Sequence, residues 1–178
     1  MLCRNAVSWL YRLERNFSWE SGLPVDRDRA YRDGSGTVRL VLERGGRITV
    51  MRGYSWNGCS PKACLCDILV GTPDGVVHAL TGRPKAYFAS LVHDALYQFM
   101  GVDAPVRRAE ADRCFLRLLG ESDFLPRYIY WAAVRALGWL VWRGKRRVRR
   151  WRGEAVDLAG LLSGTACPAV PRAVHGDA

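Results

Sequence analysis

The sequence lacks the cysteine patterns of stapled or zinc-binding domains. Its six cysteines are scattered, and the cluster of Cys59, Cys64 and Cys66 has no CxxC pair and no nearby histidine. Structural zinc sites need four ligands at regular spacing, and disulfide frameworks are typical of small secreted domains. The pattern therefore indicates reduced thiols and argues against both a zinc module and a disulfide scaffold.

Long apolar runs are also missing. Arg4 and Arg12 interrupt residues 1–13, which leaves neither the continuous apolar core nor the cleavage site of a secretory signal. The most apolar stretch, residues 128–142, contains Arg135 and is shorter than the ~20 residues that a membrane span needs. We therefore predict a cytoplasmic protein without a transmembrane span.

Acidic residues are few relative to basic ones. The 178 residues include 27 Lys and Arg against 17 Asp and Glu, which gives a formal net charge of +10. Such a charge favours an anionic partner, such as nucleic acid, lipid headgroups or an acidic protein. The hydrophobic content of 49% and charged content of 25% are globular values, and the length fits one domain with a real core.

Two segments have the alternating apolar pattern of strands. Residues 37–43 and 47–51 alternate on either side of Gly45-Gly46, which predicts a hairpin. A turn at 33–36 precedes it, with a short strand near Tyr31. Residues 53–83 are rich in glycine and proline, and we interpret them as long functional loops without regular structure.

Helical spacing of apolar residues predicts the remaining elements. The expected fold is α+β: a small antiparallel hairpin or sheet packed with a helical part built on a paired-helix core. It forms one domain over residues 1–164, followed by a loose tail over 165–178. The predicted helices span residues 2–19, 82–101, 103–119, 123–142 and 154–163.

The helix predicted over residues 82–101 carries the most distinctive chemistry. On a helix His93 and Tyr97 stand one turn apart, with Asp94 beside them. Asp112 is on the next predicted helix, where it can face His93. We interpret this set as a general-base site. His93 would take a proton from water, Asp112 would orient the ring and stabilise its cationic form, and Tyr97 would hold Asp112.

Asp94 is the candidate ligand for a hard cation, together with backbone carbonyls of the neighbouring loops. The cation would polarise a substrate carbonyl, and the whole set amounts to ester hydrolysis. A structural interpretation stays open, because a His–Asp pair can form a polar core seam and Asp112 can pair with Arg108 one turn earlier. A phosphohydrolase of the His-Asp superfamily ranks lower, because only His78 could add a metal ligand.

A basic run follows the helix predicted over residues 123–142 and holds most of the excess positive charge. Trp139, Trp142 and Trp151 lie within or beside it. Tryptophans among basic residues are typical of membrane interfaces and equally of nucleic-acid contacts, and a solvated extension is the structural alternative. The candidate contact residues in this extension over 143–152 are Arg143, Lys145, Arg146, Arg147, Arg149, Arg150 and Arg152.

Several separated motifs resemble domain-of-unknown-function family 1353, carried largely by tailed bacteriophages and prophages. They are Gly53-Tyr54-Ser55-Trp56-Asn57-Gly58-Cys59-Ser60, then Ala89-Ser90-Leu91-Val92-His93-Asp94-Ala95-Leu96-Tyr97, then Arg108, Ala111-Asp112 and Phe115. The resemblance covers roughly residues 35–140. It implies a phage- or prophage-encoded protein, cytoplasmic in the host bacterium or associated with the virion, with other phage proteins as partners. It implies no settled activity.

His93-Asp94-x-x-Tyr97 and Ala111-Asp112-x-x-Phe115 are more weakly similar to the paired-helix core of phospholipase A2, including its compact viral capsid versions. That resemblance implies His93 as the base, Asp94 as a calcium ligand and Asp112 as the support of His93. The chain departs from the pattern in having no flanking disulfides and no calcium loop that aligns. Two segments are candidates for that loop, Trp56-Asn57-Gly58 and Gly71-Thr72-Pro73-Asp74-Gly75, and Asn57 and Gly58 are the candidate Ca²⁺ ligands beside Asp94. Two functions are therefore predicted: a phospholipase-A2-like, metal-assisted ester hydrolase, or a non-catalytic phage structural or host-interaction protein that retains the helix pair as a scaffold.

Overall fold

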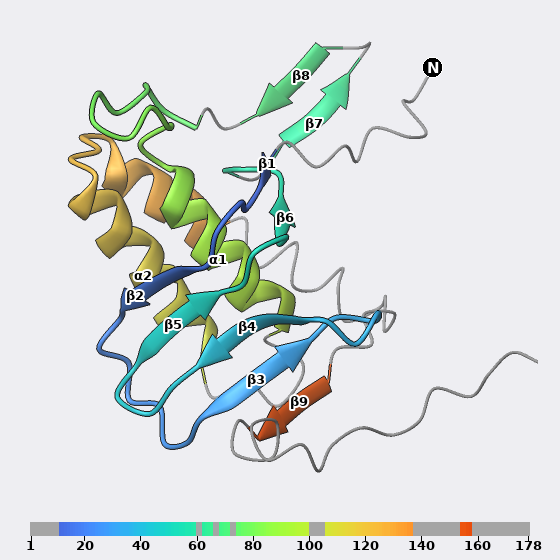
Figure 1. Ribbon diagram of the computed structural model, residues 1–178. Coiled ribbons are helices and arrows are strands. Elements are labelled where there is room, and N and C mark those ends of the chain that lie inside the picture. The colour runs from blue at the N-terminus through green and yellow to red at the C-terminus, as the bar shows by residue number, and fades with distance from the viewer. Residues whose placement is uncertain are drawn as a thin grey trace, which may run out of the picture.

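Figure 1 shows the computed structural model of the chain, which describes residues 11–59, 62–65, 68–71, 74–99, 106–136 and 154–157. The predicted basic extension over 143–152 and the tail over 165–178 lie outside the described residues, as do residues 1–10.

A five-stranded antiparallel sheet, in the order β2-β5-β4-β3-β9, forms one layer of the fold. The predicted hairpin is its centre. Leu40, Leu42, Ile48 and Val50 alternate toward the core and are at most 1% exposed. Glycines at positions 45 and 46 have φ of 91° and 92°, so this turn requires residues without a Cβ. The strands are β2 (Phe17–Glu20), β3 (Arg29–Arg32), β4 (Val38–Leu42), β5 (Arg47–Val50) and β9 (Glu154–Asp157).

Two helices, α1 (Tyr87–Phe99) and α2 (Arg108–Glu121), form the second part of the fold. α1 packs against β4 and β5, and α2 packs against α1 (Figure 1). Residues 127–136 are also helical, within the predicted helix over 123–142. Antiparallel sheets combined with helices confirm the predicted α+β class. Within the described ranges, none of the helices has the length and apolar character needed to cross a membrane.

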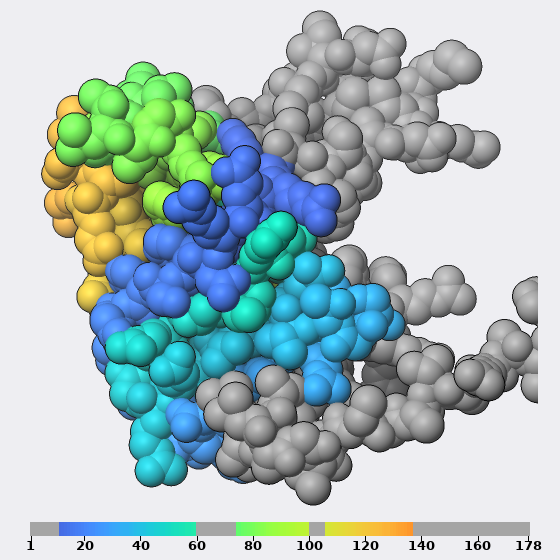
Figure 2. Space-filling model, in the orientation of Figure 1, coloured from blue at the N-terminus to red at the C-terminus, as the bar shows by residue number. Residues whose placement is uncertain are grey.

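The predicted helix over residues 2–19 is wrong for the part that the structure describes. Residues 11–12 form strand β1 (Tyr11–Arg12), and β2 follows from Phe17. Phe17 and Trp19 are partly buried and alternate with exposed neighbours, and they pair with Val50 and Ile48 of β5. Strand pairing therefore partly buries Phe17 and Trp19, apolar residues whose spacing predicts a helix. Figure 2 shows this N-terminal segment in blue, between the green segment that contains α1 and the cyan strands of the sheet.

The segment over residues 53–83 contains more regular structure than its glycines and prolines predict. Strand β6 (Ser55–Trp56) pairs with β1, and β7 (Lys62–Leu65) pairs with β8 (Ile68–Gly71) in a separate hairpin. The two hairpin strands coincide with short apolar runs, which suit strands when a neighbour is available for pairing. The prediction of loops without regular structure is therefore wrong at these strands.

The helix predicted over residues 154–163 is also wrong where the structure describes it. Residues 154–157 form β9, which pairs antiparallel with β3 so that Arg29 lies opposite Asp157 and Arg32 opposite Glu154. The strand satisfies the open edge of β3, a partner more than 120 residues earlier in the chain. Residues 158–163 lie outside the described residues.

Helix α1 begins later than the predicted position 82. The Tyr87 N–H bonds to the Pro84 carbonyl at 2.9 Å, so Pro84 belongs to the turn that leads into the helix. The Lys85 N–H bonds to the Val76 carbonyl at 3.0 Å, which ties this turn to the preceding loop. That pairing fixes the entry of the chain into α1.

Helix α2 begins at Arg108 rather than at the predicted position 103. The Arg107 N–H donates to the Glu110 carboxylate at 2.6 Å, which supplies a partner that the helix itself cannot provide at its start. The predicted N-cap, Asp103, lies outside the described residues.

Candidate functional site

Helices α1 and α2 bring three predicted site residues into contact. His93 Nε2 lies 3.1 Å from Asp112 Oδ1, and the Tyr97 hydroxyl donates to the same oxygen at 2.6 Å. His93 and Tyr97 are one helical turn apart, and their ring centroids are separated by 4.1 Å. The Phe115 ring of α2 packs 5.2 Å from the imidazole. The contact between the two helices is therefore built around one carboxylate.

Asp112 is fully buried, and two arginines hold its second oxygen. Arg135 Nη1 donates to Oδ2 at 3.1 Å, and Arg108 Nε lies 3.7 Å from it. Arg108 Nε also donates to the Tyr97 hydroxyl at 3.1 Å, and its Nη2 bonds to the Arg135 carbonyl. A buried carboxylate needs such compensation, because desolvation of an unpaired charge is costly.

Arg135 is the site residue that the sequence reasoning missed. In the sequence it only interrupts an apolar stretch. A single arginine within the otherwise apolar and aromatic stretch over 128–142 could have indicated a buried acidic partner. The predicted pairing of Asp112 with Arg108 does occur, but together with the contact to His93 rather than instead of it.

Burial and hydrogen bonding oppose each other in setting the ionisation of this network. Burial alone would lower the pKa of His93, but its contacts with Asp112 and Asp94 outweigh burial and raise that pKa above its ordinary value. Burial alone would raise the pKa of Asp112, but hydrogen bonds from His93, Tyr97 and Arg135 lower it. The network therefore favours a charged carboxylate beside a readily protonated imidazole.

The hydrogen bond to Asp112 determines which nitrogen of His93 can act as a base. A carboxylate accepts only, so Nε2 carries the proton in the neutral ring and Nδ1 keeps its lone pair. Nδ1 faces Asp94, whose Oδ1 lies 3.8 Å away. The side chains of His93 and Asp94 are 11% and 26% exposed, so this edge of the site reaches the surface.

The glycine-rich segment adjoins α1 close to Asp94. Trp56 Nε1 donates to Ser90 Oγ at 3.1 Å, one turn before Asp94. Tyr54 is buried nearby, and burial together with the negative charge of Asp94 raises its pKa well above the usual value. Tyr54 of this segment therefore lies near Asp94.

Gly58, one of the predicted loop ligands, lies against another carboxylate, that of Asp74. A Cβ on Gly58 would lie 2.4 Å from Asp74 Oδ1, and the Cys59 N–H donates to that oxygen at 2.6 Å. Asn57 is half-buried before Gly58. Among the described side chains, no three or more His, Cys, Asp or Glu residues are grouped to hold a metal. Asp94 therefore stands outside any such group of described side chains.

Searches with protein-family models, against curated proteins and against solved structures find no match to this chain. The geometry around Asp112 is therefore the feature of the molecule that indicates a function.

Proposed function

We propose that the chain is an ester hydrolase in which His93 activates water as a general base. The observation that carries the proposal is the 3.1 Å contact between His93 Nε2 and the buried Asp112 carboxylate, with Nδ1 turned toward the partly exposed Asp94. This arrangement leaves one ring nitrogen with a free lone pair at the edge of the site.

The surroundings of the imidazole suit proton transfer. When His93 takes a proton from water it becomes a cation, and the Asp112 carboxylate stabilises that cation while it keeps the ring in one orientation. Tyr97 also donates to Oδ1 of this carboxylate, and Arg135 donates to Oδ2. The raised pKa of His93 is consistent with this role, because a base works best when its pKa lies near the working pH.

The substrate class follows from the similarity of the two helix motifs to phospholipase A2, which also implies a lipid ester and a calcium ion at Asp94. A calcium ion held by Asp94 would polarise the ester carbonyl, although no three His, Cys, Asp or Glu residues are grouped for a metal among the described side chains. Calcium binding at Asp94 remains a prediction, as does the phage or prophage origin implied by the resemblance to family 1353.

A non-catalytic phage structural or host-interaction protein is the second candidate. It is favoured by the completeness of the network, since Arg108 and Arg135 already neutralise Asp112 without any substrate. A buried network of this kind can specify how the helices pack even if no reaction takes place.

Hydrolysis assays with a chromogenic short-chain ester and with phospholipid vesicles, each with and without Ca²⁺, separate the two functions. The hydrolase predicts activity that falls by about 10²–10⁴-fold in His93→Gln. Asp94→Asn is the matched control: it keeps the His93–Asp112 contact, and calorimetry with Ca²⁺ on this variant tests the metal separately. Wild-type protein that is folded yet hydrolyses neither substrate would favour the scaffold.

A further inference from the structure

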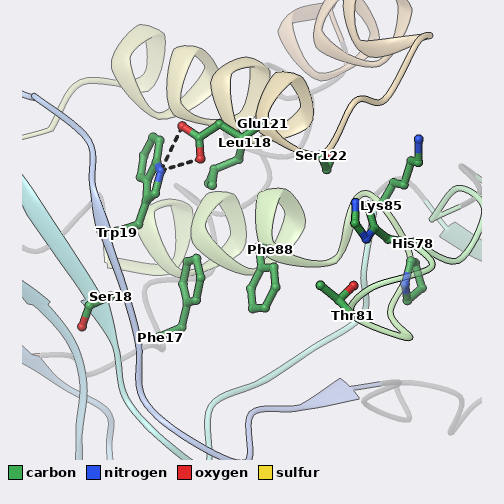
Figure 3. A pocket seen from close by; sticks show the side chains of 11 residues that line it. Phe17, Ser18, Trp19, His78, Thr81, Lys85, Phe88, Leu118, Glu121 and Ser122 are labelled. Carbon is green, nitrogen blue, oxygen red and sulfur yellow. Dashed lines mark hydrogen bonds between the residues drawn. The ribbon is translucent and has the colours of Figure 1, made fainter.

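A pocket of about 300 Å³ lies at the start of α1 and the end of α2 (Figure 3), whereas Asp112 lies near the start of α2. It is bounded by β2, by the loop before α1 and by the C-terminal end of α2, and His93 is not among its lining residues. Its volume corresponds to about ten water molecules at ~30 Å³ each. It is therefore separate from the proposed catalytic site and has the size of a small-ligand site.

One end of the pocket is apolar. The Phe17 and Phe88 rings stack with centroids 4.3 Å apart and an interplanar angle of 15°, and Leu118 of α2 lies beside them in the lining (Figure 3). Both aromatic rings are only partly buried. A ligand with an apolar body would remove the remaining ring surface from water, which is favourable.

Glu121 places a negative charge at the apolar end of the pocket. The Trp19 indole donates to both carboxylate oxygens of Glu121, at 2.9 Å and 3.1 Å. The Arg117 guanidinium lies 5.0 Å from the centroid of the Trp19 ring and does not line the pocket. An anionic group on the ligand would therefore avoid the end that Glu121 occupies.

The other end of the pocket offers hydrogen-bond donors. The Leu80 N–H donates to His78 Nδ1 at 3.3 Å, so the neutral ring carries its proton on Nε2. Lys85 Nζ donates to the Asp123 carbonyl at 2.9 Å, a contact that uses one of its three N–H groups. Thr81 contributes a hydroxyl to the same end. An ammonium group, an imidazole N–H and a hydroxyl together suit a carboxylate.

We propose that this pocket binds a small amphipathic carboxylate, with its apolar body against Phe17 and Phe88 and its carboxylate facing Lys85 and His78. The unequal ends of the pocket determine the orientation, since Glu121 repels the carboxylate and Lys85 attracts it. The site functions without the His93 chemistry, so loss of ester hydrolysis leaves it unaffected.

Calorimetric titration with decanoate and with decanol, below the concentrations at which they aggregate, tests the proposal. Decanoate should bind the wild type more tightly than decanol. Lys85→Gln should weaken decanoate binding by about tenfold and leave decanol binding unchanged, because only the carboxylate loses a charged partner. Lys85→Arg should recover most of the decanoate affinity.

Thr81→Trp is designed to fill the pocket from an exposed position, where the larger side chain leaves the core intact. It should abolish binding of both probes. Arg52→Gln, an exposed change of the same charge outside the pocket, should have no effect and controls for net charge. Circular dichroism on each variant verifies folding. Absence of decanoate binding to the wild type, equal binding of the two probes, or binding retained by a folded Thr81→Trp would each overturn the proposal.

Discussion

The two ends of the α1–α2 pair differ in how deeply their polar groups are buried and in how those groups are paired. At one end the carboxylate of Asp112 is fully buried and has four polar partners, namely His93, Tyr97, Arg108 and Arg135. At the other end Phe17, Phe88 and Lys85 are only partly buried and surround a pocket. A buried charge must be paired in one defined arrangement, whereas groups at an open pocket can exchange water for a ligand.

What covers each end explains the difference. The helical segment over 127–136 delivers Arg135 onto Asp112, and with it a cation that closes the network. At the pocket end the cover is β2 together with the loop before α1, and the one cation that these contribute to the lining, Lys85, bonds to a backbone carbonyl rather than to a buried acid. A helix pair can therefore combine a rigid polar centre with an adaptable end.

Removing the carboxylate at the buried end should have the largest effect. Asp112→Ala leaves the Arg135 and Arg108 cations and the His93 ring without their shared partner, and we expect a loss of about 3–5 kcal/mol in the free energy of unfolding. Urea denaturation measures it. Asp112→Asn retains hydrogen bonding and should lose less. A loss below about 1 kcal/mol in Asp112→Ala would show that the network contributes little.

At the pocket end, removing one ring of the stacked pair should cost less. Phe88→Ala deletes the contact with Phe17, but Phe88 is only partly buried. We expect a loss of about 2 kcal/mol, below the 3–5 kcal/mol typical of a fully buried phenylalanine. Urea denaturation beside Phe115→Ala, a fully buried position next to His93, provides the comparison. Equal losses would mean that the pocket end is as tightly packed as the core.

Changing pH should alter the stability that His93 contributes at the Asp112 end. The pKa of His93 is raised in the folded protein, so the protonated ring stabilises the fold below the unfolded value of about 6.5, and that stabilisation is lost as pH rises through the folded pKa. The stability difference between wild type and His93→Gln should therefore be larger at about pH 5.5 than at about pH 8.5. Denaturation at both pH values measures it. A pH-independent difference would contradict the raised pKa.

The smallest effect should come from Glu121, whose contact with Trp19 lies at the surface. Glu121→Gln keeps an oxygen that accepts from the indole, so we expect a change below about 0.5 kcal/mol in the free energy of unfolding. Thermal or urea denaturation is sufficient to check it. A loss above about 1 kcal/mol would show that this end depends on charge as the Asp112 end does.

The parts of the site that depend on local spacing could be predicted from the sequence. His93 and Tyr97 share a face because they are four residues apart, and the next helix offered Asp112 as a partner. Arg135 could not be assigned, because its partner is 23 residues away on another element. The pocket could not be predicted for the same reason, because Phe17 and Phe88 meet only after β2 has paired with β5.

Some strands could likewise be predicted from the local sequence, and others could not. The β4–β5 hairpin is joined by a tight glycine turn, and its alternation is visible within fifteen residues. β1 and β2 carry apolar residues that also satisfy helical spacing, and only their pairing with distant strands decides between the two structures. β9 depends entirely on β3 and has no local signal of its own.

The pairing of β3 with β9 has a consequence for how the protein is made. While the chain emerges from the ribosome, β3 can pair with β4, and α1 can pack on the hairpin, long before residues 154–157 have been synthesised. During that interval the free edge of β3 is open to pairing with another nascent chain. Nascent chains that stop before β9 should therefore be more prone to aggregation than the completed chain.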